Sequence, residues 1–395
     1  MTASSPPRGI GLYLAALQFA LALGWVVYAA YLPQLARQAG LEARWVPWLL
    51  MADQLVFVLT DLAVGLASDR AARVLGRIGH AVLAATLVSA LAFVLLPQVA
   101  RQGASSAFVA LTFVWAVTSA ALRAPPLTLL GRYVARPAQP ALVALTSFGL
   151  GLASAAAPYL ALQLKTVDPA WPFALSAALL AAVTAGMVAA ERALARHGPA
   201  ARDASAAAWP DAALLLAFLA AAALGAAAFQ WHGFVASAPL ALRFATAAEL
   251  PWLLPVFWVG FNLALVPAAR LVKARGPLRA MAAGGLLAAG GAAAAAFAPG
   301  LGLLLAAQSL AGAGWAVLLC SAFSGALAIG RGGRAGFVAG ALSSTLALAA
   351  LARIAFVSQL APPPALVQGL AWLAAAGFVA CALLSVAGAR RAPAA

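Results

Sequence analysis

The sequence predicts an all-α membrane protein with twelve transmembrane helices in two pseudo-symmetric six-helix bundles. Hydrophobic residues make up 65% of the chain and charged residues 8%, whereas an ordinary soluble domain has about 45–50% and about 25%. The apolar residues form twelve runs, each long enough to cross a hydrocarbon core of about 30 Å as a helix. A weak internal repeat relates the first six runs to the last six.

The twelve spans follow one another with short polar breaks. In chain order they are 11–35, 45–68, 79–100, 106–130, 140–164, 170–190, 211–237, 250–272, 279–298, 301–329, 335–360 and 364–388. The first span follows Arg8 as a secretory signal would, but its apolar core of about 25 residues is too long for one, so we expect a retained helix. The longest polar break predicts a cytoplasmic linker, 191–210, between an N-terminal bundle, 1–190, and a C-terminal bundle, 211–395.

The net charge of +15 is a topology signal, because the Lys and Arg residues gather in alternate breaks. One side carries Arg8, Arg70, Arg73, Arg77, Arg132, Arg136, Arg192, Arg196, Arg202, Arg270, Lys273, Arg275, Arg279, Arg331, Arg334, Arg390 and Arg391. The other side carries Arg37, Arg44, Arg101, Lys165 and Arg243. The positive-inside rule then places both termini in the cytoplasm. The Ala-rich, Arg-over-Lys composition suggests a bacterium, and hence its inner membrane. We expect no nucleic-acid partner.

The internal repeat lies at an offset of about 200 residues. Pro47-Trp48-Leu49-Leu50 recurs as Pro251-Trp252-Leu253-Leu254, and Trp115-Ala116-Val117 recurs as Trp315-Ala316-Val317. Gly131-Arg132 likewise recurs as Gly330-Arg331. Two halves of the same topology imply an axis along the membrane normal and a cavity between the halves.

The break after the second span reads Gly65-Leu66-Ala67-Ser68-Asp69-Arg70, followed after five residues by Gly76-Arg77. This stretch resembles the Gly-x-x-x-Asp-Arg signature of the major facilitator superfamily of secondary transporters, with three extra residues before Gly76. The Gly-Pro-rich fifth-helix motif of its proton-driven drug antiporters is degenerate here, at Gly149, Gly151 and Pro158. The resemblance implies gating roles for Gly65, Asp69, Arg70, Arg77 and Arg334. In that family the counterpart of Asp69 meets the start of the eleventh helix, here Gly333-Arg334-Ala335-Gly336.

Charged residues inside a span are candidates for function, because lipid offers them no partner. Four qualify: Asp53, Asp61, Arg123 and Arg353. With a rise of 1.5 Å per residue, Asp61 and Arg123 fall at about 24 and 26 Å from the outer surface, and Asp53 and Arg353 at about 12 and 10 Å. We therefore expect an Asp61–Arg123 pair in one half, either structural or functional. The resemblance adds an Asp53–Arg353 pair between the halves, and Asp53 or Asp61 is the candidate proton carrier.

Other polar side chains in the spans are candidates for lining a substrate cavity. They are Gln18, Tyr28, Tyr31, Gln54, His232 and Asn262. An alternative for His232 is a structural role as a hydrogen-bonded histidine at a helix interface. Pro125-Pro126, just after Arg123, is expected to kink or unwind the fourth helix.

The sequence thus predicts a monomeric secondary transporter that moves a small organic solute by alternating access, with protons as the coupling partner. Arg123 and Arg353 permit an anionic group in the solute. Efflux of amphipathic compounds by proton antiport is an alternative, and a transporter-like sensor or scaffold is an alternative of another class. No nucleotide-binding loop, catalytic motif or metal-ligand spacing occurs, so we expect no cofactor, no metal and no enzymatic activity.

Overall fold

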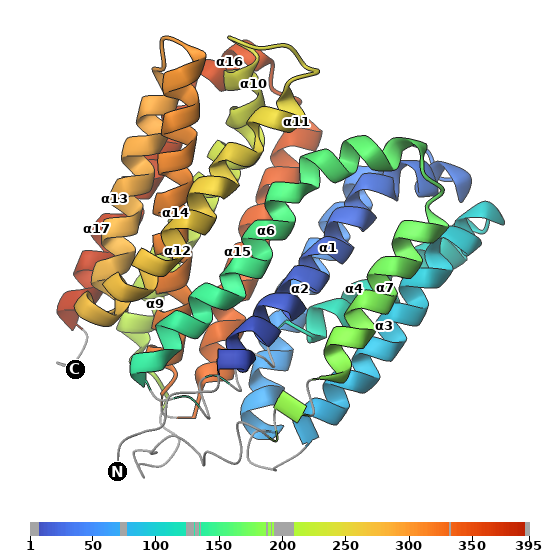
Figure 1. Ribbon diagram of the computed structural model, residues 1–395, viewed down its shortest axis with the longest axis horizontal. Helices are drawn as coiled ribbons and strands as arrows, with labels where there is room; N and C mark the ends of the chain where they lie inside the picture. Colours follow the sequence, from blue (N-terminus) through green and yellow to red (C-terminus); the bar gives the residue numbers. More distant parts are fainter. Residues whose placement is uncertain are drawn as a thin grey trace.

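The computed structural model describes residues 8–71, 77–123, 136–186, 209–331 and 333–391, with Leu130, Val134, 189–190 and Arg192 besides. Every regular element in these residues is helical (Figure 1). The first half contains α1 Arg8–Gln38, α2 Trp45–Ala71, α3 Arg77–Arg101, α4 Ser105–Ala121, α6 Gln139–Gln163 and α7 Ala170–Ala185. The second half contains α9 Ala212–Gln230, α10 Ser237–Ala241, α11 Leu250–Leu253, α12 Pro255–Arg275, α13 Pro277–Ala296, α14 Leu301–Ile329, α15 Ala335–Leu360, α16 Pro364–Gly369 and α17 Leu373–Arg391.

Ten helical runs in the described part of the chain are long and apolar enough to cross a membrane. Two shorter apolar helices, α4 and α7, bring the number to the predicted twelve. The helix α4 ends at Ala121, nine residues before the end of the predicted span. Pro125-Pro126, the reason for expecting a break there, lies outside the described residues, as does the stretch 193–208 of the predicted linker.

The helices form two bundles that lean against each other (Figure 1). The helix α1 begins and α17 ends at the same end of the molecule, which we call the terminal end. Between the bundles, α15 packs along α2 and α12 packs along α6. At the opposite end α6 also contacts α11, where the rings of Tyr159 and Trp252 meet edge to face at 4.9 Å.

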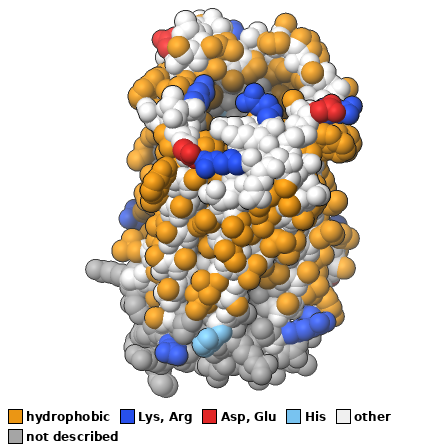
Figure 2. Space-filling model, turned by 90° about the vertical axis from the view of Figure 1, so that its right-hand side faces the viewer, with side chains coloured by type: hydrophobic (Ala, Val, Ile, Leu, Met, Phe, Trp, Pro, Cys, Tyr) orange, Lys and Arg blue, Asp and Glu red, His pale blue; other side chains and the backbone are white. Residues whose placement is uncertain are grey.

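The surface is that of a protein with hydrocarbon around it. Figure 2 shows apolar side chains across the middle of one face, with Lys and Arg gathered toward the two ends. Large side chains such as Leu59, Leu263 and Phe297 are more than 60% exposed. A band of this kind contacts lipid in a membrane, where the charged ends reach the headgroups.

Within the described residues, three predicted spans are interrupted. The span 211–237 contains a π-helical turn, Trp231–Ala236, between α9 and α10. The span 250–272 is divided into α11 and α12 at Pro255, which has no N–H to continue the helical hydrogen bonds. The span 364–388 is divided into α16 and α17.

The first and third interruptions lie against each other. The indole Nε1 of Trp231 donates to the carbonyl of Leu370 at 3.1 Å, in the break between α16 and α17. The side-chain amide of Gln368 donates to the carbonyl of Pro239 at 2.8 Å. Side chains thus satisfy carbonyls near the broken helices, as backbone at membrane depth requires. Hydropathy alone does not predict these breaks or the hydrogen bonds between them.

Close helix packing in the second bundle depends on glycines. A Cβ added to Gly312 of α14 would overlap the carbonyl oxygen of Phe257 in α12, and one added to Gly291 of α13 would overlap the backbone of Ala311 in α14. Between helices in lipid, where water drives no association, such small residues allow the backbone contact that holds helices together.

Two adjacent glycines of α13 make a matched test. Gly291 is buried against Ala311, whereas a Cβ on Gly290 would meet nothing within 4 Å. We expect Gly291→Ala to destabilise the protein by about 1–3 kcal/mol through overpacking. We expect Gly290→Ala to be neutral or stabilising by up to about 1 kcal/mol, because Ala favours helix. Thermal unfolding of the two variants in the same detergent measures the difference, and equal melting temperatures would contradict the packing.

Candidate functional site

The end of α2 is fastened to the start of α15 by one carboxylate. The Oδ1 atom of Asp69 accepts the N–H of Gly336 at 2.7 Å, and Oδ2 accepts the N–H of Phe337 at 2.8 Å. These N–H groups belong to the first turn of α15, where helical N–H groups lack partners and the helix dipole favours negative charge. The structure therefore brings Asp69 to the helix start that the family resemblance indicates.

Glycines let the two backbones touch beside this carboxylate. A Cβ on Gly65 would overlap the carbonyl oxygen of Gly336, and one on Gly340 would overlap that of Asp61. One turn further from the terminal end, the hydroxyl of Ser344 donates to the carbonyl of Val58 at 2.6 Å. We call this contact, from Asp69 to Val58 on α2, the terminal latch.

The basic residues proposed for gating lie around the latch in different ways. The guanidinium of Arg334 lies 3.9 Å from the centroid of the Trp209 ring, a cation–π contact. Arg70 is exposed. The side chain of Arg77 lies outside the described residues.

Asp61 and Arg123 are in contact within the first bundle. The Nη2 atom of Arg123 lies 3.3 Å from Oδ2 of Asp61, and its guanidinium lies 5.0 Å from the centroid of the Phe57 ring. Asp61 is fully buried, whereas 32% of the Arg123 side chain is exposed. The equal depths predicted for these two residues thus correspond to an ion pair between α2 and the end of α4.

Asp53 is buried in the same bundle and has no basic partner among the described residues. Its Oδ2 atom accepts the hydroxyl of Tyr28 at 2.7 Å, while Oδ1 is buried and has no hydrogen-bond partner among the described residues. The Tyr28 ring lies 4.4 Å from that of Trp115 and 5.5 Å from that of Trp25. A buried, half-satisfied carboxylate beside an aromatic cluster is an unusual group in a membrane-spanning bundle.

The predicted contact between Asp53 and Arg353 is not made by these two residues in this conformation. The Nε atom of Arg353 donates to Oε1 of Gln230 at 2.8 Å, and the guanidinium lies 4.8 Å from the centroid of the Phe234 ring. Arg353 is nine residues beyond Ser344, so it lies about 14 Å further along α15 and about half a turn away from the face that meets α2. The depth of a residue in the membrane does not predict the direction in which its side chain points around the helix.

The candidate cavity residues are divided among several environments. Nε2 of His232 lies 2.9 Å from Oε1 of Gln308, and Nδ1 is buried with no hydrogen-bond partner in the described part of the chain. Asn262 donates to the carbonyl of Trp258, and its Oδ1 faces Gly151 across the α6–α12 contact. Gln54 is buried and Gln18 half-buried.

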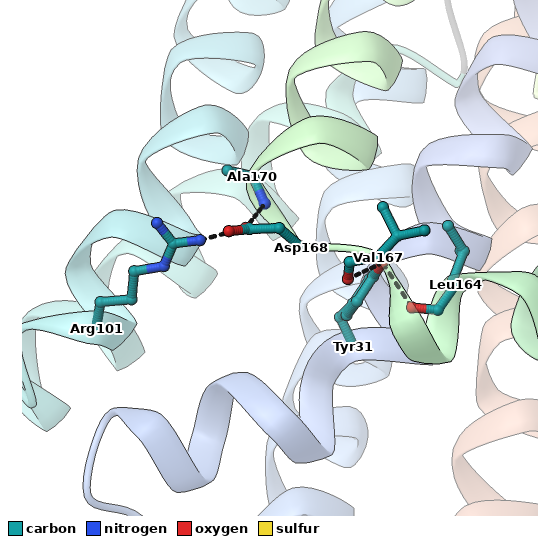
Figure 3. A network of polar contacts seen from close by, with 6 residues as sticks. All are labelled: Tyr31, Arg101, Leu164, Val167, Asp168 and Ala170. Atoms are coloured by element: carbon teal, nitrogen blue, oxygen red, sulfur yellow. Dashed lines mark hydrogen bonds and ion pairs between the residues drawn. The ribbon is translucent and has the colours of Figure 1, made fainter.

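Tyr31 belongs to the framework of the opposite end. Its hydroxyl lies 2.9 Å from the carbonyl of Leu164 and 3.0 Å from that of Val167 (Figure 3). The next residue, Asp168, pairs with Arg101 and accepts the N–H of Ala170. These contacts fix the turn before α7 and give the Tyr31 hydroxyl a structural role, while cavity lining by Tyr31 stays a prediction.

Several residues of the site were not identified from the sequence, although signals for them exist. Gly340 and Ser344 follow Gly336 at intervals of four residues, the small-residue spacing of close helix contacts in membranes. Gln230 and Gln308 are amides inside apolar spans, which are conspicuous in the way that charged residues are.

Solved structures with the same fold are known, although no model of a protein family and no curated protein matches the sequence. A bacterial homologue of the iron transporter ferroportin, in an outward-facing state, has a TM-score of 0.74 at 14% identity, over 96% of this chain and 99% of that chain. The human organic anion transporter MFSD10 has a TM-score of 0.68 at 17% identity, over 97% and 99%. The major facilitator transporter FucP, in the outward conformation, has a TM-score of 0.69 at 16% identity, over 96% and 98%. The chain is therefore a multi-pass membrane protein with the major facilitator fold.

The Asp61–Arg123 pair predicts unequal single and double substitutions. Arg123→Gln leaves the fully buried Asp61 without its cation, and we expect a loss of about 2–4 kcal/mol, since breaking a buried pair costs about 3–5 kcal/mol and Arg123 is partly exposed. The double variant Asp61→Asn/Arg123→Gln is expected to recover most of this loss. Thermal unfolding of the three proteins measures it, and a double variant no more stable than Arg123→Gln would contradict a buried pair.

The terminal latch predicts that Asp69→Asn opens the terminal end. The amide turns an NH2 group toward a backbone N–H, and each lost hydrogen bond to a charged group is worth about 1.5–3 kcal/mol. With Cys320 and Cys381 replaced by Ala, Ser344→Cys reports opening through maleimide labelling, which we expect Asp69→Asn to accelerate at least about tenfold. Ser385→Cys, buried in α17, is the control and should stay slow. Unchanged labelling at position 344 would contradict the latch.

Proposed function

We propose that this chain, which has the major facilitator fold, is a proton-coupled secondary transporter that moves a small organic solute across the membrane by alternating access. The observation that carries the proposal is the terminal latch. It joins the two bundles through separable contacts, namely one carboxylate on a helix start, a glycine crossing and one hydroxyl. A contact of this kind can open while each bundle stays folded.

The sidedness follows from the charges. The terminal end collects the larger set of Lys and Arg residues, so the positive-inside rule favours its lying in the cytoplasm. The closed latch then corresponds to a conformation sealed toward the cytoplasm. The outward states of two structures with this fold support the same reading.

Asp53 is the proposed proton carrier. It is buried between α2 and α1, and Tyr28 occupies only one of its oxygens. The free Oδ1 can take up a proton without breaking the Tyr28 hydrogen bond. Asp61 is the weaker choice, because Arg123 already balances its charge. Protonation of a carboxylate changes the cost of its burial in the membrane, which is how it couples to a change of conformation.

Among structures with this fold, FucP is a fucose:proton symporter and MFSD10 an organic anion transporter. These names support transport as the activity and show that the fold serves unrelated solutes. The solute of this chain must therefore be sought in its own residues.

Asp53→Asn is expected to uncouple transport from protons. A solute that stabilises the purified protein is first found by thermal shift, since ligands raise the stability of the state that they bind. Proteoliposomes containing the pH-sensitive dye pyranine then report proton movement with that solute. We expect wild type to move protons with solute, and Asp53→Asn to lose proton movement while keeping solute counterflow.

Asp168→Asn is the matched control. Asp168 is an acidic residue of the same bundle, but its side chain is exposed at the end opposite the terminal end. It should behave as wild type. Proton movement that survives in Asp53→Asn would overturn the role of Asp53, and wild-type protein without counterflow of any stabilising solute would overturn transport itself.

A further inference from the structure

Arg353 is a cation inside a membrane-spanning helix that is held by neutral groups. It is half-buried in α15, with Nε hydrogen-bonded to Gln230 and the face of the guanidinium over Phe234. Gln230 ends α9 and Phe234 belongs to the π-helical turn that follows, so both contacts come from the same membrane crossing. These contacts orient the guanidinium, but because both partners are neutral they do not neutralise its positive charge.

Every acidic side chain in the described part of the chain is engaged elsewhere. The partners are Tyr28 for Asp53, Arg123 for Asp61, the start of α15 for Asp69, Arg44 for Glu42, Arg101 for Asp168, Leu214 for Asp211 and Thr246 for Glu249. Arg353 therefore has no carboxylate partner among the described residues. An arginine at membrane depth without an anion is costly.

We propose that Arg353 binds the anionic group of the transported solute, an organic carboxylate, with Gln230 as its positioning residue. This inference rests on the proposed function and names its substrate class. A guanidinium fork binds carboxylate through two parallel N–H···O bonds. The hydrogen bond from Nε to Gln230 leaves the two Nη groups for that contact.

The neighbouring rings indicate an apolar part in the same solute. Phe234 is 53% exposed, although it packs edge to face on Phe229 at 5.5 Å. Phe229 in turn stacks on Trp315 at 4.2 Å. A carboxylate on the guanidinium thus has an aromatic surface beside it, which a ring or short aliphatic chain can cover.

Benzoate is a suitable probe, with benzyl alcohol and benzylammonium as its neutral and cationic counterparts. We expect benzoate alone of the three to raise the melting temperature of the full-length protein in phosphatidylcholine nanodiscs. Arg353→Gln should weaken benzoate at least about tenfold, the equivalent of one lost charged hydrogen bond. Arg353→Lys, which keeps the charge and loses the fork, should lie between the two and serves if Arg353→Gln does not fold.

Arg243→Gln is the matched control. Arg243 also lies over a phenylalanine ring, 5.0 Å from the centroid of Phe244, but its Nη groups already bond the carbonyls of Ala296 and Ala298. It should bind benzoate as wild type does. Equal loss in both variants, or equal stabilisation by benzoate and benzyl alcohol, would overturn the proposal.

Two further experiments test whether a lipid phosphate or Asp53 occupies the Arg353 site instead. If phosphatidylglycerol nanodiscs abolish the benzoate effect, a lipid phosphate occupies Arg353 and the solute assignment fails, whereas equal effects in both lipids support it. If Asp53→Arg/Arg353→Asp restores the stability that either single change removes, Asp53 is the counter-ion and the proposal fails. Benzoate binding without benzoate counterflow would keep the anion site and remove the proposed transport function.

Discussion

The contact between α2 and α15 determines how the two bundles sit together. In lipid, helices gain nothing by hiding apolar surface from water, so they associate through close packing and polar bonds. The terminal latch has both, because Gly65 and Gly340 allow the backbones to touch and Asp69 occupies the unpaired N–H groups of α15. Beyond Val58 these bonds end, and the next charged residue of each helix, Asp53 or Arg353, turns to its own bundle.

The sequence predicts the helices well because hydrocarbon imposes one strong rule, that the backbone must satisfy itself within each crossing. Each of the four charged residues that it singles out in the spans has a specific partner or ring contact, and their functional roles stay predictions. The breaks near Trp231 and Leu370 could not be predicted in this way. They depend on hydrogen bonds between residues 139 positions apart, which no local pattern encodes.

Partner choice was the other limit of the sequence. Depth correctly placed Asp61 beside Arg123, because these residues sit on helices of one bundle that run in the same direction. Similar depths, together with the family resemblance, put Asp53 beside Arg353, but pairing also requires the two side chains to face each other. Arg353 projects from α15 toward α9, and Asp53 projects from α2 toward α1. The direction in which a side chain points around a helix can be worked out only from a known contact of that helix. Here the contact of Ser344 with α2 provides the reference.

The internal repeat shows where the two bundles differ. The match of Pro47 with Pro251 sets an offset of 204, which relates Asp53 to Phe257 and Asp61 to Leu265. Around these positions the framework is shared, since Trp25 stacks on Trp115 in one half and Phe229 stacks on Trp315 in the other. In the second bundle an apolar residue, Phe257, thus packs in this framework at the position that corresponds to Asp53. Packing therefore does not by itself require a carboxylate at position 53, which supports the role proposed for Asp53 in the transport cycle.

Neutral partners distinguish the charges proposed to act from those that hold the fold. Asp61 and Arg123 balance each other's charge, which makes them the weaker candidates for binding a proton or an anion. Tyr28 and Gln230 instead orient Asp53 and Arg353 through one hydrogen bond each and leave their charges uncancelled. A charged side chain that is already oriented and has no counter-ion binds a proton or a small ion with little further ordering cost, so it suits reversible binding. In the proposed cycle the bound species is a proton in the first bundle and an organic anion in the second, so each bundle contributes one of the two transported species' sites.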